Sequence, residues 1–186
     1  MDIFRKLSWA DSTGDAIPLY HDGVYHIFSL TSPPGTTVYP ARLRTTWEHS
    51  VSKDLVHWEE VGTALYPGEG EEPDACGVWT GAAVYGEGKF HIFYTGYNYN
   101  VHFEQTICHA VSDDGIHFEK DPKNPIIIPN EEEYEVGDWR DPYVFYNEDD
   151  ACYWILISGR KKEGPPSRRG CIVLYRSKDL DNWEYY

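Results

Sequence analysis

A short phrase of sequence occurs three times in this chain of 186 residues, and it limits the folds that the chain can adopt. Each copy has the form Ser-x-Asp-x-x-x-aromatic, and the copies begin at Ser52, Ser112 and Ser177, 60 and then 65 residues apart. Two short β-type runs joined by a turn precede each copy, over 17–30, 82–96 and 143–159. A fixed period of this length, carried by short strands, is typical of a repeated sheet unit such as a β-propeller blade.

One repeat contains a strand, a tight turn, a second strand, a connection, a third strand, the Ser-x-Asp turn and a last strand. We therefore predict an all-β propeller with four-stranded blades at about 9–66, 74–128 and 136–186. The repeat continues without a linker, so we expect no division into separate domains. Because common propellers have about 4–8 blades, three blades cannot close a ring. We expect the remaining blades to come from sequence beyond Tyr186 or from another chain.

The charge balance restricts the partners that the chain can bind. It has 31 acidic residues against 16 basic ones, a formal net charge of −15. Nucleic acids and anionic membranes bind positively charged surfaces, so we expect neither as a partner. Aromatic residues make up 16% of the chain. Their rings could stack on sugars while carboxylates bind sugar hydroxyls, although aromatic residues also suit strands and propeller cores. This composition favours a carbohydrate partner.

Targeting and metal-binding signals are weak in this sequence. Residues 1–10 lack the apolar run of a signal peptide, and no stretch approaches about 20 apolar residues. We therefore expect a cytoplasmic protein. The four cysteines have no C-x-x-C spacing, so we expect buried free thiols. The histidines at 26, 49, 91 and 109 recur in strand contexts, and we interpret them as structural residues. We expect no metal and no other cofactor.

Aligning the three hairpins brings out a set of equivalent polar residues. The alignment uses the residues that open the second strand of each hairpin, Tyr25, Phe90 and Tyr153. It places Asp15, Thr80 and Asp141 at the same position of the first strand, which lines the central channel of a propeller. Two carboxylates that face each other across a pocket are what cleavage of a glycosidic bond requires. The alternative is that both aspartates are turn residues, because Gly14-Asp15 and Asp141-Pro142 are turn-like dipeptides.

Four segments resemble, in order and spacing, those of family 32 glycoside hydrolases, which include invertases, levanases and inulinases. Arg140-Asp141-Pro142 resembles the family's Arg-Asp-Pro motif. The segment from Trp47 to Trp58 resembles its Trp-Gly-His segment with the Ser-x-Asp-Leu-x-His-Trp that follows. Trp79-Thr80-Gly81-Ala82 is similar to Phe-Ser-Gly-Ser, and Tyr94-Thr95-Gly96 matches Tyr-Thr-Gly. The resemblance covers nearly the whole chain.

This resemblance implies a five-bladed propeller with an axial active site that hydrolyses β-fructofuranosides, such as sucrose or fructans, with retention of configuration. It implies that Asp15 is the nucleophile, that Asp141 stabilises the transition state and that Arg140 contacts the substrate. We expect Thr80 to bind substrate at the same mouth. Trp47 and Trp79 are candidate sugar platforms, with the blade core as the alternative for each.

The family's general acid, a Glu of the fourth blade, is expected beyond Tyr186. Should the acid lie inside the chain, Glu48 and Glu135 are the first candidates.

The sequence departs from the family pattern in its first blade. The family's opening Trp-x-Asn-Asp-Pro-Asn-Gly corresponds here to the segment from Trp9 to Ala16. Counting forward from Trp9 favours Asp11 as the nucleophile, whereas counting back from Tyr25 favours Asp15, and the repeat supports the second count. Leu30 stands where the family has Gln, and Ala82 stands where it has the last Ser of Phe-Ser-Gly-Ser.

Two other functions remain open from the sequence. One is a family 43-type propeller that cleaves arabinan or xylan with inversion, against which Arg140 and the segment from Trp47 to Trp58 argue. Inverting enzymes hold their carboxylates about 6.5–9.5 Å apart, and retaining enzymes about 5–5.5 Å apart. The other is a propeller that binds carbohydrate without catalysis.

Overall fold

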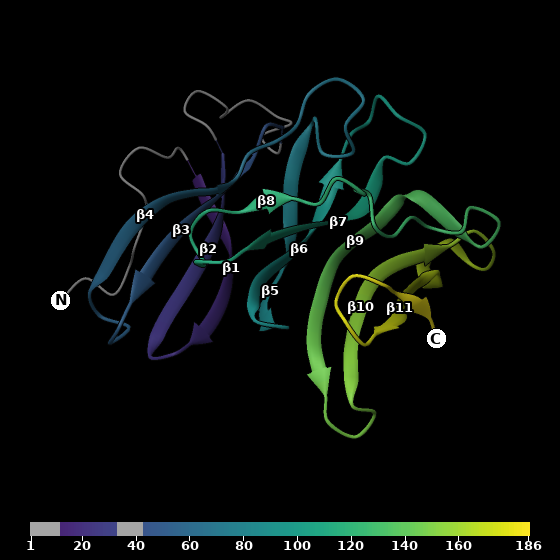
Figure 1. Ribbon diagram of the computed structural model, residues 1–186. Helices are drawn as coiled ribbons and strands as arrows, with labels where there is room; N and C mark the ends of the chain where they lie inside the picture. The colour runs from purple at the N-terminus through teal and green to yellow at the C-terminus, as the bar shows by residue number, and fades with distance from the viewer. Residues whose placement is uncertain (1–11, 33–42) are drawn as a thin grey trace.

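The structure is a computed structural model that describes residues 12–32 and 43–186. Trp9 and Asp11 lie outside the described residues, so the structure does not test the forward count from Trp9 that favours Asp11 as the nucleophile. The described chain forms three four-stranded antiparallel sheets side by side (Figure 1). One 3-10 turn, η1 (Pro166–Arg168), is the only helical element in this part of the chain. The prediction of an all-β fold is confirmed, and the number of blades in a closed ring stays a prediction.

Each sheet is built from four consecutive strands of the chain. The first sheet holds β1 (Ser12–His21), β2 (Val24–Ser32), β3 (Thr46–Ser52) and β4 (Trp58–Leu65). The second holds β5 (Gly77–Gly86), β6 (Lys89–Tyr97), β7 (Gln105–Ser112) and β8 (Glu119–Lys120). The third holds β9 (Tyr134–Asn147), β10 (Cys152–Lys161), β11 (Gly170–Ser177) and β12 (Glu184–Tyr185). The strands pair in sequence order within each sheet.

The pairing register repeats from sheet to sheet. Between the second and third strands, Tyr25 lies opposite Ser52, Phe90 opposite Ser112, and Tyr153 opposite Ser177. The three sheets can therefore be compared residue by residue with the alignment that the sequence suggested.

Two apolar clusters hold the sheets together. Phe28 and Trp47 of the first sheet pack with Tyr94 of the second, and all three side chains are fully buried. Phe93 of the second sheet and Trp139 of the third are likewise fully buried in the other cluster. The first strands meet in the middle, because β5 contacts both β1 and β9 (Figure 1). Burial of this apolar surface fixes the three first strands beside one another.

The Ser-x-Asp phrase forms a hydrogen-bonded turn between the third and fourth strands. In the first copy, the Ser52 hydroxyl accepts from the Leu55 amide at 2.9 Å, and Asp54 Oδ1 accepts from the amide of His57 at 2.7 Å. The same bonds recur around Ser112 and Ser177. The pKa of each turn aspartate is lowered. The main cause is a hydrogen bond from the side chain of the residue three positions later, and hydrogen bonds from backbone amides add to it. The repeated phrase is therefore a structural device.

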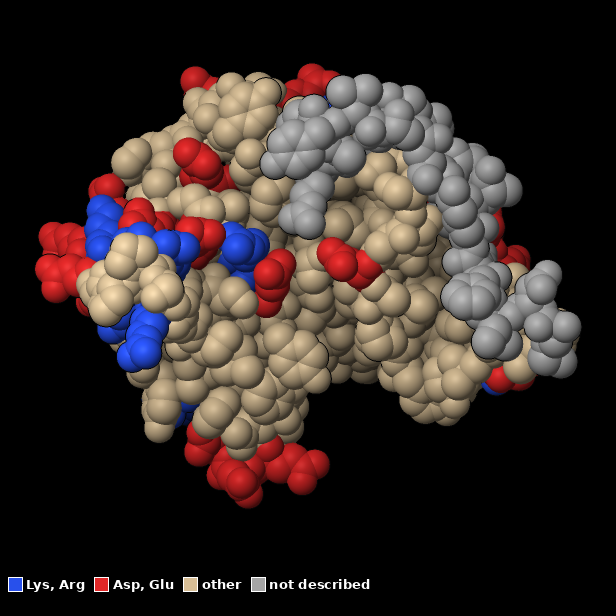
Figure 2. Space-filling model, turned by 180° about the vertical axis from the view of Figure 1, so that it is seen from behind, with Lys and Arg blue, Asp and Glu red and all other residues tan. Residues whose placement is uncertain are grey.

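The structure has an acidic surface and free cysteines, as we expected from the sequence. Acidic side chains are spread over the back of the molecule, and Lys and Arg side chains gather at the side of the third sheet (Figure 2). All four cysteines are free, and three of them are buried whereas Cys171 is half-buried. Among the described residues, no helix is long and apolar enough to cross a membrane.

Candidate active site

The first strand of each sheet carries a β-bulge at the same place. In β1 the bulged residue is Asp15, between the pairs Gly14–Leu30 and Ala16–Ser29. In β5 it is Thr80, and in β9 the bulge contains Asp141 and the proline that follows it. A bulge inserts a residue outside the ladder and redirects its side chain. The three residues that the hairpin alignment made equivalent therefore share one backbone device.

The backbone at two of these positions is unusual. Asp15 has φ 42° and Asp141 has φ 56°, both in the left-handed region. Few residues other than glycine adopt this conformation, and Asp is one of those that tolerate it. In β5 the bulge depends on the next residue instead, because a Cβ at Gly81 would overlap the carbonyl oxygen of Phe93. The local sequence thus matches what each bulge requires.

The bulges bring the polar side chains into contact across sheets. The Thr80 hydroxyl of the second sheet donates a hydrogen bond to Asp15 Oδ2 of the first. In the third sheet, Arg140 Nε lies 3.7 Å from Asp141 Oδ2, and the two side chains are 38% and 45% exposed. One end of the three first strands therefore presents two carboxylates and a guanidinium to solvent.

Arg140 is held by two further groups. Its Nη1 lies 2.7 Å from Asp138 Oδ1 and donates to Gln105 Oε1 at 3.1 Å. The same Gln105 oxygen accepts from the backbone amide of Trp139 at 3.2 Å. Gln105 is buried at the start of β7, so the second sheet fixes the arginine of the third. Gln105 was not predicted from the sequence, because it belongs to none of the repeated or family-like segments.

The three bulges and the residues beside them line a hollow of about 490 Å³, which we call the bulge hollow. Its lining residues are Ser12, Thr13, Gly14, Asp15, Leu30, Ser32, Thr45, Trp79, Thr80, Arg140 and Asp141. The structure thus brings five of the six predicted site residues together: Asp15, Trp79, Thr80, Arg140 and Asp141. Trp79 stacks on Tyr97 with ring centroids 4.0 Å apart and keeps part of its surface exposed.

Trp47 is the sixth predicted site residue, and the structure does not place it in the bulge hollow. Its side chain is fully buried in the cluster between the first two sheets, and its Nε1 donates to the carbonyl oxygen of Trp79 at 3.1 Å. The prediction of a sugar platform at Trp47 is wrong, because a ring with no exposed face cannot stack on a sugar. Trp47 instead supports the backbone of Trp79.

Neither glutamate considered as an internal acid lies in the bulge hollow. The Glu48 carboxylate is buried and accepts hydrogen bonds from the hydroxyls of Thr46 at 2.8 Å and Thr63 at 2.9 Å. Glu135 pairs with Arg169 at 2.7 Å. Both carboxylates are engaged in structural contacts, so neither stands where it could protonate a group bound between Asp15 and Asp141.

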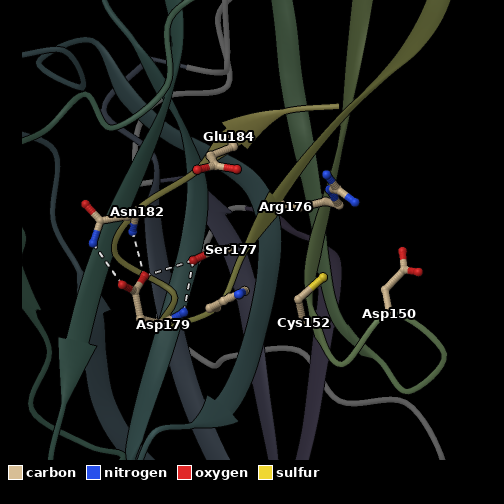
Figure 3. A pocket seen from close by; sticks show the side chains of 8 residues that line it. Asp150, Cys152, Arg176, Ser177, Asp179, Asn182 and Glu184 are labelled. Carbon is tan, nitrogen blue, oxygen red and sulfur yellow. Dashed lines mark hydrogen bonds between the residues drawn. The ribbon is translucent and has the colours of Figure 1, made fainter.

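A second hollow, of about 480 Å³, surrounds the third Ser-x-Asp turn and is lined by Ser177, Asp179, Asn182 and Glu184 among others (Figure 3). The second sheet has a smaller hollow of about 260 Å³ around its own turn, lined by the equivalent residues. Neither hollow shares a residue with the bulge hollow. Because the hollow recurs with the turn, we interpret it as a by-product of that turn.

One group of metal-type donors occurs among the described residues. Donor atoms of His109, Asp121 and Asp181 lie within 4.8 Å of one another. Both ring nitrogens of His109 already have partners, since Nε2 lies 2.9 Å from His91 Nδ1 and Nδ1 lies 3.2 Å from Asp121 Oδ2. We therefore interpret His109 as a structural residue and assign no metal to this group.

Comparison with known proteins agrees with the motifs. The model of the glycosyl hydrolases family 32 N-terminal domain matches residues 15–186. An insoluble β-fructofuranosidase isoenzyme of Arabidopsis thaliana is 32% identical over 91% of this chain and 30% of its own length. A sucrose-6-phosphate hydrolase of Zymomonas mobilis is 31% identical over 89% of the chain and 31% of its own length.

The solved structures give the same result. Fructan 1-exohydrolase IIa from Cichorium intybus matches with a TM-score of 0.77 and 28% identity, over 95% of this chain and 32% of that one. The chain therefore spans about a third of the length of the proteins it resembles. The family inferred from four short motifs is confirmed by a match over almost the whole chain, and this chain belongs to glycosyl hydrolase family 32.

Proposed function

We propose that this chain supplies two of the active-site carboxylates of a glycosidase that acts on β-fructofuranosides such as sucrose or fructans. The observation that carries the proposal is the convergence of Asp15 and Asp141, from two different sheets, on the bulge hollow. Relatives named for hydrolysis of sucrose-6-phosphate and for fructan exohydrolase activity support the substrate class. The remaining blades and the proton donor come, in this proposal, from sequence beyond Tyr186 or from another chain.

The reaction we propose has two steps. In the first, a carboxylate oxygen of Asp15 attacks the anomeric carbon while the bond from that carbon to the leaving oxygen breaks, and the leaving oxygen takes a proton from a glutamic acid outside this chain. In the second step that glutamate removes a proton from water, whose oxygen attacks the anomeric carbon and releases Asp15. Two inversions give net retention of configuration.

The other residues of the bulge hollow have supporting roles in this mechanism. The Thr80 hydroxyl fixes one oxygen of Asp15, which leaves the other free to attack. Asp141 accepts hydrogen bonds from sugar hydroxyls, and these strengthen as positive charge develops on the ring. Arg140, held by Asp138 and Gln105, offers its remaining donors to a substrate oxygen. The exposed part of Trp79 provides a face on which the sugar can stack.

The test is hydrolysis of sucrose and of a fructan by the full-length protein that contains this chain, run in water with methanol added. Retention predicts that the first transfer product is the methyl β-fructofuranoside, which NMR identifies. The α-anomer would contradict the two-step mechanism while leaving glycosidase activity intact. Binding of fructosides without any turnover would favour the carbohydrate-binding propeller instead.

A further inference from the structure

Thr95, near the end of β6, contacts two bulges at once. Its side chain is fully buried. Its Oγ1 donates to the carbonyl oxygen of Thr80 at 2.9 Å and accepts from the backbone amide of Asp141 at 2.8 Å. The first bond lies within the second sheet, whereas the second crosses to the third sheet. One hydroxyl therefore ties together the backbones of two bulges.

The polarity of these two bonds is specific to a hydroxyl. Thr95 must donate to a carbonyl and accept from an amide through the same atom, and among side chains of this size only Ser and Thr do both. Valine has the same shape but would leave the Thr80 carbonyl and the Asp141 amide without this partner. A buried polar group that loses its partner pays its full desolvation cost, so the backbone would move to satisfy it.

The contacts continue to the other carboxylate. The side chain of Thr80, whose carbonyl Thr95 binds, donates to Asp15. Asp15 therefore binds the side chain of Thr80, the carbonyl of Thr80 binds Thr95, and Thr95 binds the amide of Asp141. These contacts form a continuous path from Asp15 to Asp141. We propose that Thr95 is a positioning residue that sets the separation and orientation of the Asp15 and Asp141 carboxylates across three sheets.

The position of Asp141 is sensitive to this anchor. Its left-handed backbone, with φ 56°, holds the carboxylate in an orientation that a relaxed strand would not give. A shift of about 1 Å in a reacting group can cost about 100-fold in rate. Thr95 itself touches no substrate in this proposal, so its loss should lower kcat far more than it raises KM. This kinetic reading rests on the proposed function.

The experiment uses the full-length protein with three substitutions: Thr95→Val, Thr95→Ser and Thr106→Val. Thr106 is a matched control, because it is equally buried on the neighbouring strand and its hydroxyl contacts Cys108 at 3.8 Å, away from the bulges. We expect Thr95→Val to lower kcat about 10- to 100-fold with KM changed less than about threefold. Thr95→Ser should recover most of the rate, and Thr106→Val should keep it even where its Tm falls equally.

Several outcomes would overturn the proposal. They are an unchanged kcat in Thr95→Val, a loss that serine does not rescue, or an equal loss in Thr106→Val at the same Tm. Inactive wild-type protein would instead refute the proposed function. If the wild-type protein is inactive, a crystal structure of Thr95→Val tests the positioning role on its own. We expect displaced backbone at Asp141, and a bulge that superposes on the wild type would refute the positioning role.

Discussion

The bulges of β1, β5 and β9 and the three Ser-x-Asp turns are both repeated three times, but they repeat in different ways. The turns keep the same Ser and Asp and the same pattern of hydrogen bonds in every copy. The bulges keep the backbone device and change the side chain, from Asp15 to Thr80 to Asp141. Repetition of residue and bond together indicates a structural role. A repeated backbone geometry that carries a different side chain in each copy indicates a site where side chains from different sheets meet and have different functional roles.

The largest expected effect is the loss of catalysis when the aspartate of the first bulge is replaced. Asp15→Asn in the full-length protein should lower kcat by several orders of magnitude, because an amide is a far poorer nucleophile than a carboxylate. Its Tm should stay close to that of the wild type. Asp11→Asn tests the competing count of the opening motif and should be mild. The contrast fails if Asp15→Asn stays active, and the register fails if Asp11→Asn is the inactive variant.

The next effect concerns the arginine at the bulge hollow. Arg140→Lys keeps the charge but cannot reach Asp138 and Gln105 while also offering donors to a substrate oxygen. We expect kcat/KM for sucrose to fall about 10- to 100-fold, or about 1.4–2.8 kcal/mol of transition-state stabilisation. Arg160→Lys is the control, since its Nε lies 3.9 Å from Asp138 and outside the bulge hollow. Near-full activity of Arg140→Lys would reduce Arg140 to a surface residue.

A turn aspartate should show the opposite pattern. Asp114→Ala removes the acceptor for the amides of Ile116 and His117, both at 2.9 Å, so stability should fall by about 1 kcal/mol. This corresponds to a few degrees in Tm, measured by calorimetry. The kcat of the folded protein should not change. Asp113→Ala, which loses only an exposed pair with Lys89, should be neutral in both measurements. A loss of kcat in Asp114→Ala would break the contrast.

The last effect concerns the pH dependence of stability and leaves kcat unchanged. It comes from a feature shared by the first two sheets and absent from the third. Each of them buries a histidine pair, His26 with His49 and His91 with His109, where the third sheet has Trp154 and Leu174. Burial lowers the pKa of His49 to about 3 and that of His91 to about 4. The unfolded chain therefore takes up protons first as the pH falls below about 6.5.

Stability should accordingly be greatest above pH 6.5 and decline as the pH falls toward 4, by up to about 1.4 kcal/mol per pH unit for each such histidine. His49→Leu, which copies the third sheet, should flatten this decline without affecting kcat. Denaturant unfolding at a series of pH values measures the slope. An unchanged slope would show that His49 does not carry the acid sensitivity.

The sequence predicted the sheets and the bulge residues well for a physical reason. A tandem repeat of strands can be aligned with itself, and an equivalent position in one blade is an equivalent position in space. This is why Asp15, Thr80 and Asp141 could be brought together without coordinates. The bulges themselves were not predicted, because the extra residue in each strand looks like a slip in the alignment.

The misses have a different origin. An aromatic residue in a family-like segment can serve the core or the surface, and nothing in the sequence told Trp47 from Trp79. Gln105 and Thr95 act through hydrogen bonds that cross between sheets, and these depend on how neighbouring blades are set against each other. No periodicity or spacing encodes such a contact, so only the structure reveals it.

The left-handed backbone at Asp15 and Asp141 also restricts how this fold could lose its chemistry. Asparagine and glycine tolerate such a backbone best, whereas β-branched or bulky residues would strain it. Asn replaces Asp through a single base change and keeps the shape of the side chain. A descendant that drifts from enzyme to lectin-like protein would therefore be expected to pass through Asn or Gly at these positions, with its sheets unchanged. Such a relative would be recognised by those substitutions alone.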